Sequence, residues 1–103
     1  MHHDAYLVGR KEEPLQHPYK GMDKAFGGVR LDQQEIQKAE FSHCTFANIS
    51  FKYSKIAESQ FVNCVFIGCY FRRSDLINTN FQGCKFIDCD RSEERRVGKE
   101  CRL

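Results

Sequence analysis

The sequence predicts an all-β protein, a small solenoid in which the chain turns repeatedly and stacks each turn on the previous one. Two observations predict it: a large apolar residue recurs at every fifth position over half of the chain, and a small residue lies two positions before nearly all of them. The apolar positions are Phe41, Phe46, Phe51, Ile56, Phe61, Phe66, Phe71, Leu76, Phe81 and Phe86. The positions two residues earlier are Ala39, Cys44, Ile49, Ser54, Ser59, Cys64, Cys69, Ser74, Thr79 and Cys84, of which only Ile49 is large.

A spacing of five residues fits neither a helix nor an extended strand. A helix advances about 100° per residue, so steps of five scatter the Phe side chains around the axis. A long strand alternates its faces, so steps of five place successive Phe side chains on opposite sides. The offset of two does place each small residue and the following apolar residue on one face of a short strand. Both sets can face one interior only if the chain turns a corner in every unit, which predicts a solenoid.

From about Phe41 to Asp90 the chain resembles the pentapeptide-repeat family, whose units have a central Leu or Phe and a small residue two positions before it. The resemblance covers ten consecutive units and implies a right-handed quadrilateral β-helix with four pentapeptides per coil. Cys and Ser dominate where members of the family often have Ala. With 20 residues per coil, five cysteines should lie in two inward columns: Cys44, Cys64 and Cys84 in one, Cys69 and Cys89 in the other.

The N-terminal part departs from this pattern. Residues 1–25, which contain both prolines and scattered charge, are predicted to form a poorly ordered arm or an extension of a cap. Residues 26–40 keep the five-residue spacing without the small partners, so they are predicted to be a degenerate first coil or capping segment. A short helix over Leu31–Glu40, which contains good helix formers, is the alternative.

The repeat breaks at Arg91, where the register requires Phe or Leu. Residues 91–103 contain eight charged side chains among 13 residues and show no period. They resemble the conceptual translation of a sequencing adapter joined in frame. We therefore predict a charged, non-native tail and native repeats that continue beyond Asp90, so that this chain is a fragment. A natural charged tail is the alternative.

The formal net charge of +2 comes from this tail, which holds five basic and three acidic residues and leaves 11 of each in residues 1–90. A neutral body argues against binding to polyanions, so nucleic acid is not an expected partner. No apolar run approaches the roughly 20 residues of a membrane span, and the N-terminus lacks the apolar region of a secretory signal. We therefore expect no membrane association, a cytoplasmic location and reduced thiols.

No catalytic site, metal or cofactor is expected. The pairs Cys64–Cys69 and Cys84–Cys89 are spaced more widely than usual zinc ligands, and burial inside the repeat already accounts for these side chains. The four histidines are dispersed, and the sequence contains no acid–base pair, nucleophile motif or phosphate-binding loop. The protein is therefore predicted not to be an enzyme.

Two outward surfaces are candidate binding sites. The side around Phe51 and Phe71 should display a basic and aromatic patch able to dock an acidic protein surface or a phosphate backbone: Lys52, Tyr53, Tyr70, Arg72 and Arg73. The neighbouring side should display exposed aliphatic contacts: Val65, Ile67 and Ile87, with Ile67 over Ile87. An ordinary solvated face and the strand preference of β-branched residues are the respective alternatives.

We expect the protein to be a non-catalytic, rigid β-helical scaffold that binds another protein, which the sequence does not identify. Some pentapeptide-repeat proteins imitate DNA and bind type II topoisomerases such as gyrase, which implies the alternative of a fragment of such a protein. Residues 41–90 carry five basic and four acidic side chains, a poor match to DNA. A purely structural solenoid segment is the third possibility, with end-to-end self-association through the open coil near Phe86.

Overall fold

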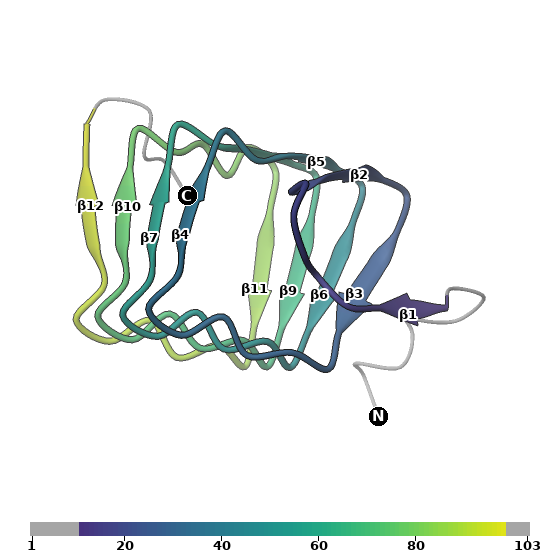
Figure 1. The fold of residues 1–103 in the computed structure, drawn as a ribbon, viewed down its shortest axis with the longest axis horizontal. Coiled ribbons are helices and arrows are strands. Elements are labelled where there is room, and N and C mark those ends of the chain that lie inside the picture. Colours follow the sequence, from purple (N-terminus) through teal and green to yellow (C-terminus); the bar gives the residue numbers. More distant parts are fainter. Residues whose placement is uncertain (1–10, 99–103) are drawn as a thin grey trace.

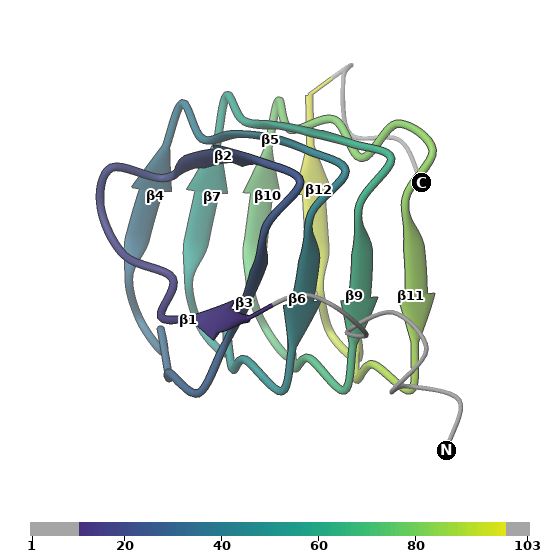
Figure 2. The ribbon, with the colours of Figure 1, turned by 90° about the vertical axis from the view of Figure 1, so that its right-hand side faces the viewer.

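The computed structural model describes residues 11–98, which form an all-β solenoid with strands along its sides, as Figure 1 and Figure 2 show. The strands are β1 (Glu12–Glu13), β2 (Lys20–Met22), β3 (Ala25–Gly27), β4 (Glu35–Gln37), β5 (Glu40–Ser42), β6 (Thr45–Ala47), β7 (Lys55–Ala57), β8 (Gln60–Val62), β9 (Val65–Ile67), β10 (Asp75–Ile77), β11 (Lys85–Ile87) and β12 (Arg95–Val97). The predicted all-β solenoid is confirmed. Within the described residues no helix is long and apolar enough to cross a membrane.

The coils stack so that residues 20 positions apart are neighbours on parallel strands. The β6 side is the sheet β1-β3-β6-β9-β11, the β7 side is the sheet β4-β7-β10-β12, and the β5 side is the sheet β2-β5-β8. The fourth side, called here the bridge side, is joined by single β-bridges between Arg30 and Ser50, Ser50 and Tyr70, and Tyr70 and Asp90. Four five-residue units therefore complete one coil, as the resemblance implied.

Each corner of the coil is a residue in the left-handed backbone conformation, two positions after the inward apolar residue. Every such position from Asp23 to Gly98 has a positive φ, between 47° and 95°. Nine of these sixteen residues are Gly, Asn or Asp, which tolerate this conformation best. The remaining corners include bulky residues such as Tyr53, whose amide is held by the Arg72 carbonyl of the next coil at 3.0 Å. These corners explain why a period of five can keep one face inside.

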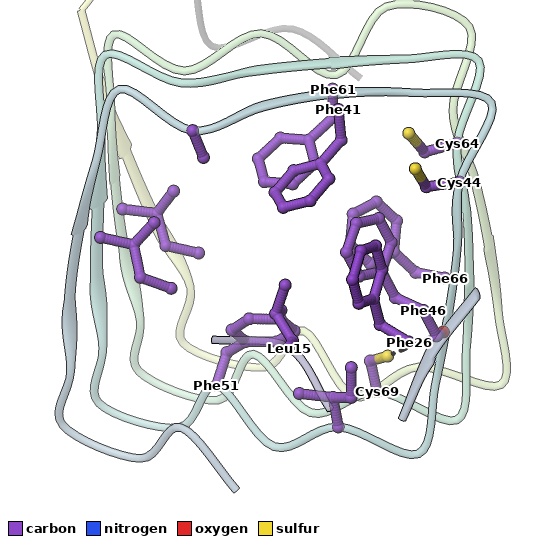
Figure 3. Packing of buried hydrophobic residues seen from close by; sticks show 14 of the residues in the cluster. Leu15, Phe26, Phe41, Cys44, Phe46, Phe51, Phe61, Cys64, Phe66 and Cys69 are labelled. Carbon is purple, nitrogen blue, oxygen red and sulfur yellow. Dashed lines mark hydrogen bonds between the residues drawn. The ribbon is translucent and has the colours of Figure 1, made fainter. Parts of the chain in front are cut away.

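Inside the solenoid the Phe rings stack in columns along its axis (Figure 3). Phe46 and Phe66 are nearly parallel with ring centroids 4.7 Å apart, and Phe86 follows 4.9 Å from Phe66. Neighbouring columns meet edge to face, as Phe61 and Phe66 do at 5.5 Å. Burial of each ring contributes roughly 1.5–3 kcal/mol, and each ring pair adds about 0.5–1.5 kcal/mol. The columns are therefore the main apolar core.

The small residues leave room for the rings and satisfy backbone carbonyls at the corners. The Cys69 thiol donates to the Phe46 carbonyl at 3.3 Å, and the Ser74 hydroxyl donates to the Phe71 carbonyl at 2.8 Å. Figure 3 shows Cys44 and Cys64 next to each other, both inside the coil. The five inward cysteines are confirmed: Cys44, Cys64 and Cys69 are buried, and Cys84 and Cys89 are partly buried against the core.

The stacked thiols differ in acidity along each column. A hydrogen bond with Cys64, together with burial, raises the pKa of the Cys44 thiol far above its usual value. A hydrogen bond with Cys89, together with burial, does the same to the pKa of Cys69. The hydrogen bond from Cys69 in turn lowers the pKa of Cys89 to about 7. Only the outer member of this pair is therefore able to ionise near neutral pH.

The N-terminal part is more ordered than predicted. The poorly ordered arm over residues 1–25 is wrong for its second half, because β1 pairs with β3 and β2 pairs with β5, while residues 1–10 lie outside the described residues. Leu15 is buried in the core, and the Lys24 ammonium lies 3.8 Å from the Glu13 carboxylate. The alternative helix over Leu31–Glu40 is also wrong, because the neighbouring coil offers these residues backbone partners: β4 pairs with β7 and β5 with β8. Residues 26–40 therefore form a regular part of the first coil.

Residues 91–98 also differ from the prediction, because they continue the coil instead of leaving it. β12 pairs with β10, and the Ser92 carbonyl accepts a hydrogen bond from the Arg73 amide at 3.1 Å. The guanidinium of Arg91 takes the place of an inward Phe and lies 4.3 Å from the Phe86 ring centroid. Glu94 takes a small position, where its side chain is buried and pairs with Arg91 at 2.7 Å. Residues 91–98 therefore extend the coil along the bridge side and the β7 side, whereas β11, which contains Phe86, is still the last strand of its sheet among the described residues. Residues 99–103 lie outside the described residues.

The corner geometry predicts that alanine substitution destabilises the protein to different extents at two glycines that both have a left-handed backbone. At Gly68, with φ +62°, a Cβ atom would lie 2.6 Å from Asn48 Oδ1, whereas at Gly28, with φ +70°, it would meet nothing within 4 Å. Gly68→Ala should therefore lower the free energy of unfolding by about 1–3 kcal/mol, and by more than Gly28→Ala does. Urea unfolding measures both. Equal losses, or a Gly68→Ala loss that persists undiminished in an Asn48→Ala background, would contradict the corner contact.

The thiol columns predict that stability falls as pH rises above about 9. In the unfolded chain the thiols ionise near their usual pKa, whereas Cys44 and Cys69 keep their protons when folded. The unfolded state then binds fewer protons, so the free energy of unfolding decreases with rising pH. The Cys89 thiol has the opposite effect on the free energy of unfolding, and only between pH 7 and 9, because its pKa is lower in the folded than in the unfolded chain.

Urea unfolding between pH 9 and 10.5 measures this decrease. The matched control is the double variant Cys44→Ser/Cys69→Ser, since serine already occupies equivalent positions at Ser54 and Ser74. The variant should show a shallower decrease than the natural chain. Identical slopes would show that these two thiols are not the cause.

Candidate functional site

The bridge side carries the candidate binding face, and the coil geometry determines which residues share it. Strand-like backbone turns every second side chain outward, and the next coil lies about 4.8 Å away, so outward residues form columns. Three columns run along this side. They contain Arg30, Ser50, Tyr70 and Asp90; Asp32, Lys52, Arg72 and Ser92; and the corner residues Gln33, Tyr53, Arg73 and Glu93.

The structure places all five residues predicted for this face on the bridge side. Tyr53 and Tyr70 are 52% and 45% exposed, which makes them two of the four most exposed large apolar side chains in residues 11–98. The Lys52 ammonium lies 5.3 Å from the Tyr70 ring centroid, a distance at which the ring attracts the cation. Arg72 and Arg73 are both exposed.

Glu93 changes the charge of the predicted basic patch. Its carboxylate lies 3.3 Å from an Arg72 guanidinium nitrogen and 3.1 Å from one of Arg73. The hydrogen bond and charge of Arg73, followed by Arg72, lower the pKa of Glu93. The two arginines are thus paired within the chain. The 20-residue spacing from Arg73 to Glu93 was the available signal, but the prediction ended the coil at Asp90.

Asp32 is a second residue that the sequence reasoning missed. It accepts a short hydrogen bond from the Ser50 hydroxyl and another from the Arg30 guanidinium at 2.9 Å. The Ser50 hydrogen bond and then Arg30 lower the pKa of Asp32, so this carboxylate stays charged. Its partner Ser50 is 18 residues away, because the two residues lie in adjacent columns of successive coils. Extension of the 20-residue columns back from Lys52 would have placed Asp32 on this side.

These residues frame a small pocket on the bridge side. It has a volume of about 260 Å³ and is lined by Arg30, Asn48, Ser50, Lys52 and Tyr70. The lining residues come from three successive coils, so no short sequence motif could have predicted them. A wider concavity of about 450 Å³ lies on the β5 side, where Met22, Phe41 and Val62 give it a more apolar wall.

The predicted aliphatic contact surface on the β6 side is corrected in one respect. Ile67 stacks over Ile87 as expected, since the two are register partners. Ile67, however, is only 1% exposed, and Val65 and Ile87 are half-buried. Ile67 occupies the middle of its column, with Ala47 in the coil before and Ile87 in the coil after, so the solvent reaches little of it. This column is not an exposed aliphatic patch.

The described residues contain no group of three or more His, Cys, Asp or Glu side chains arranged to hold a metal ion. The hydroxyls of Ser54 and Ser59 donate to the carbonyls of Phe51 and Ala57, and the inward thiols likewise bond to carbonyls. These groups are therefore engaged in the fold. The bridge side offers charged groups, hydrogen-bonding groups and aromatic rings.

Four five-residue units per coil, one inward apolar residue in each unit and a left-handed corner after it define this chain as a pentapeptide-repeat β-solenoid. The family model described as the SV2A/B/C luminal domain matches residues 20–91, which are 72 of the 103 residues. The chain belongs to the SV2A/B/C luminal-domain family. The match begins at the first residue of β2.

A comparison with solved structures gives a related result. The chain is similar to a pentapeptide repeat protein (Rfr23) from the cyanobacterium Cyanothece 51142, with 14% sequence identity, 84% of this chain and 92% of that chain covered, and a TM-score of 0.26. At this TM-score the class of fold rests on the coil geometry alone. No curated protein matches the chain.

The site geometry predicts how the pKa of one carboxylate responds to a substitution. Ser50→Ala removes the hydrogen bond that contributes most to the lowered pKa of Asp32, so this pKa should rise toward its usual value. A pH titration followed by the carboxyl ¹³C signal of Asp32 measures the change. In the control Ser92→Ala the pKa of Asp32 should not move, while that of Asp90 should rise, since Ser92 bonds Asp90. An unchanged Asp32 pKa in Ser50→Ala would contradict the geometry.

Proposed function

We propose that the protein is a non-catalytic scaffold for protein–protein interaction and that its partner binds the bridge side. The observation that carries the proposal is the pair of exposed tyrosines, Tyr53 and Tyr70, on one flat side of a rigid coil. Tyr and Arg are the side chains that most often dominate the binding energy of protein interfaces. Lys52, Arg72 and Arg73 surround the tyrosines with charges that could orient a partner.

The rigidity of the bridge side supports this role. The amide of Phe51 donates to the Tyr70 carbonyl at 2.6 Å, and the amide of Tyr53 donates to the Arg72 carbonyl at 3.0 Å. The rings of Phe51 and Phe71 stack behind the face with centroids 4.9 Å apart. A surface ordered in advance loses little conformational entropy on binding, which favours affinity.

Two other functions remain as alternatives. A longer topoisomerase-binding protein that imitates DNA would need an acidic face, whereas the bridge side mixes Arg30, Lys52 and Arg72 with Asp32 and Glu93. A purely structural segment would associate end to end through its terminal coil, as an unpaired edge invites. Val97 in that coil, which is 44% exposed, is one of the exposed large apolar side chains of residues 11–98. Self-association would then not depend on the bridge side.

We also propose that the chain works where thiols stay reduced, such as the cytoplasm. The five cysteines of the described residues are free, and each donates to a backbone carbonyl, a bond that a disulfide would remove. The family description assigns the SV2A, SV2B and SV2C domains to a lumen, where disulfides are common. Mass spectrometry tests this on protein purified from its host and alkylated in denaturant without a reductant, since Cys44, Cys64 and Cys69 are buried in the folded chain. Five alkylated interior thiols support a reducing compartment, and cross-coil disulfides refute it.

The test of the binding face compares three proteins. The natural chain is used to capture a partner from its host, and that partner is then purified and titrated against each variant. The double variant Tyr53→Ala/Tyr70→Ala should raise Kd at least tenfold, since tyrosines at the centre of an interface contribute on the order of 1–2 kcal/mol each. The control Met22→Ala, which truncates a still more exposed apolar side chain on the β5 side, should leave Kd unchanged.

Equal affinity in the natural chain and the double tyrosine variant would overturn the proposal. Sedimentation equilibrium tests the structural alternative: concentration-dependent assembly that the tyrosine substitutions leave intact, without any purified partner, would favour a solenoid segment.

A further inference from the structure

The pocket on the bridge side combines charged, hydrogen-bonding and aromatic side chains from three coils. Arg30 comes from the first coil, Asn48, Ser50 and Lys52 from the second, and Tyr70 from the third. An aromatic ring, two cations and two neutral hydrogen-bonding side chains therefore meet in a volume of about 260 Å³. All of these residues lie within the ordered repeats, away from residues 91–98.

Counted over the lining residues and Asp32, the pocket carries one positive charge, and Asp90, whose pKa is lowered by hydrogen bonds and also by Lys52, is not among the lining residues. Arg30 and Lys52 supply two positive charges, and the adjacent carboxylate of Asp32 supplies one negative charge. Asp32 stays ionised, because the Ser50 hydrogen bond and Arg30 lower its pKa. It uses its two oxygens on the Ser50 hydroxyl and on a single Arg30 nitrogen. Since a guanidinium has five N–H donors and an ammonium three, both cations keep donors for a further anion.

We propose that this pocket binds a carboxylate from an acidic side chain of the partner protein. The inference rests on the proposed function and names the chemical group that the bridge side recognises. The carboxylate lies between the Arg30 guanidinium and the Lys52 ammonium, and the aliphatic stem of the partner's Glu or Asp packs on the Tyr70 ring. The Ser50 hydroxyl and the Asn48 amide line the floor.

A carboxylate fits the charge better than a phosphate does. A single negative charge matches the net positive unit of the pocket, whereas a phosphate dianion would keep an excess negative charge beside Asp32. A flat carboxylate also pairs in fork geometry with a guanidinium. Lys52 is already held over the Tyr70 ring at 5.3 Å, so little side-chain entropy is lost when it binds.

A protein is the expected source of this carboxylate, because the pocket by itself buries little of a small molecule. Its volume is below the roughly 300–1,000 Å³ of sites that enclose free ligands. The side chain of Arg30 is 75% exposed, so the rim stays open to water. A partner lying across the exposed rings of Tyr53 and Tyr70 would exclude that water and strengthen the ion pair.

The test uses short peptides and requires no knowledge of the partner. A ¹⁵N-labelled natural chain is titrated with an acetylated, amidated tetraglutamate peptide, and backbone amide shifts are followed by NMR. Amides of Ser50, Lys52 and Tyr70 should shift together and saturate, with a Kd on the order of millimolar as expected for an isolated anchor. The uncharged tetraglutamine peptide should give no shifts. Inorganic phosphate and glucuronate are the two further arms.

Matched variants separate this site from general charge effects. Arg30→Gln/Lys52→Gln should weaken tetraglutamate binding at least tenfold. Lys52→Arg, which keeps Arg30 and the positive charge at position 52, should retain most of the affinity. Lys85→Gln on the β6 side should change the affinity less than twofold. The amide spectrum of each variant shows whether the fold is intact, so loss of folding cannot be mistaken for loss of binding.

The outcomes are distinct. Shifts confined to the pocket and lost in the double glutamine variant support the inference. Tighter binding of phosphate or glucuronate than of tetraglutamate, or shifts spread over all basic residues, would overturn it. If tetraglutamate binds here but the partner's affinity survives Tyr53→Ala/Tyr70→Ala, the pocket is real and the proposed protein interface is wrong. If the tyrosine variant loses the partner and tetraglutamate does not bind, the interface stands without this anchor.

Discussion

The solenoid depends on one constraint, the left-handed residue that turns the chain after every inward apolar side chain. At most corners the amide is held by the next coil: Asn48 donates to the Ile67 carbonyl at 2.8 Å and Gly68 to the Ile87 carbonyl at 2.9 Å. The corner therefore bends the chain and ties two coils at the same point. Because the bonds involve only the backbone, one coil can template the next whatever its side chains are.

This templating explains how a charged segment can follow the repeats. Residues 91–98 have Arg and Glu where the pattern has Phe and small residues, and yet β12 pairs with β10 along its whole length. The side chains adapt in the interior: Glu94 is buried between Arg91 and Arg96, and Arg91 covers the Phe86 ring. Buried ion pairs of this kind rarely stabilise as much as apolar packing would. The backbone ladder, more than the side chains, holds this turn in place.

The stacking of coils gives the β7 side and the bridge side different charge patterns. On the β7 side one column alternates in sign, Glu35, Lys55, Asp75 and Arg95, and the last two form an ion pair at 3.2 Å. Opposite charges in direct register support the stacking of coils. On the bridge side the column from Arg30 through Ser50 to Tyr70 lacks this alternation. On the bridge side Arg30 and Lys52 therefore line a shallow pocket together with the Tyr70 ring.

The sequence by itself determined the class of fold, the inward residues and the five cysteine positions, because a strict period of five with a small residue at a fixed offset has one structural solution. It also placed Lys52, Tyr53, Tyr70, Arg72 and Arg73 on one side. Only the tertiary structure decided which of them are already paired, since Glu93 reaches Arg73 from 20 residues away and Asp32 reaches Ser50 from 18. It also decided the burial of Ile67 and the order of residues 12–25. Those features depend on contacts between coils, and side-chain reach and solvent access across coils are not encoded in the local period.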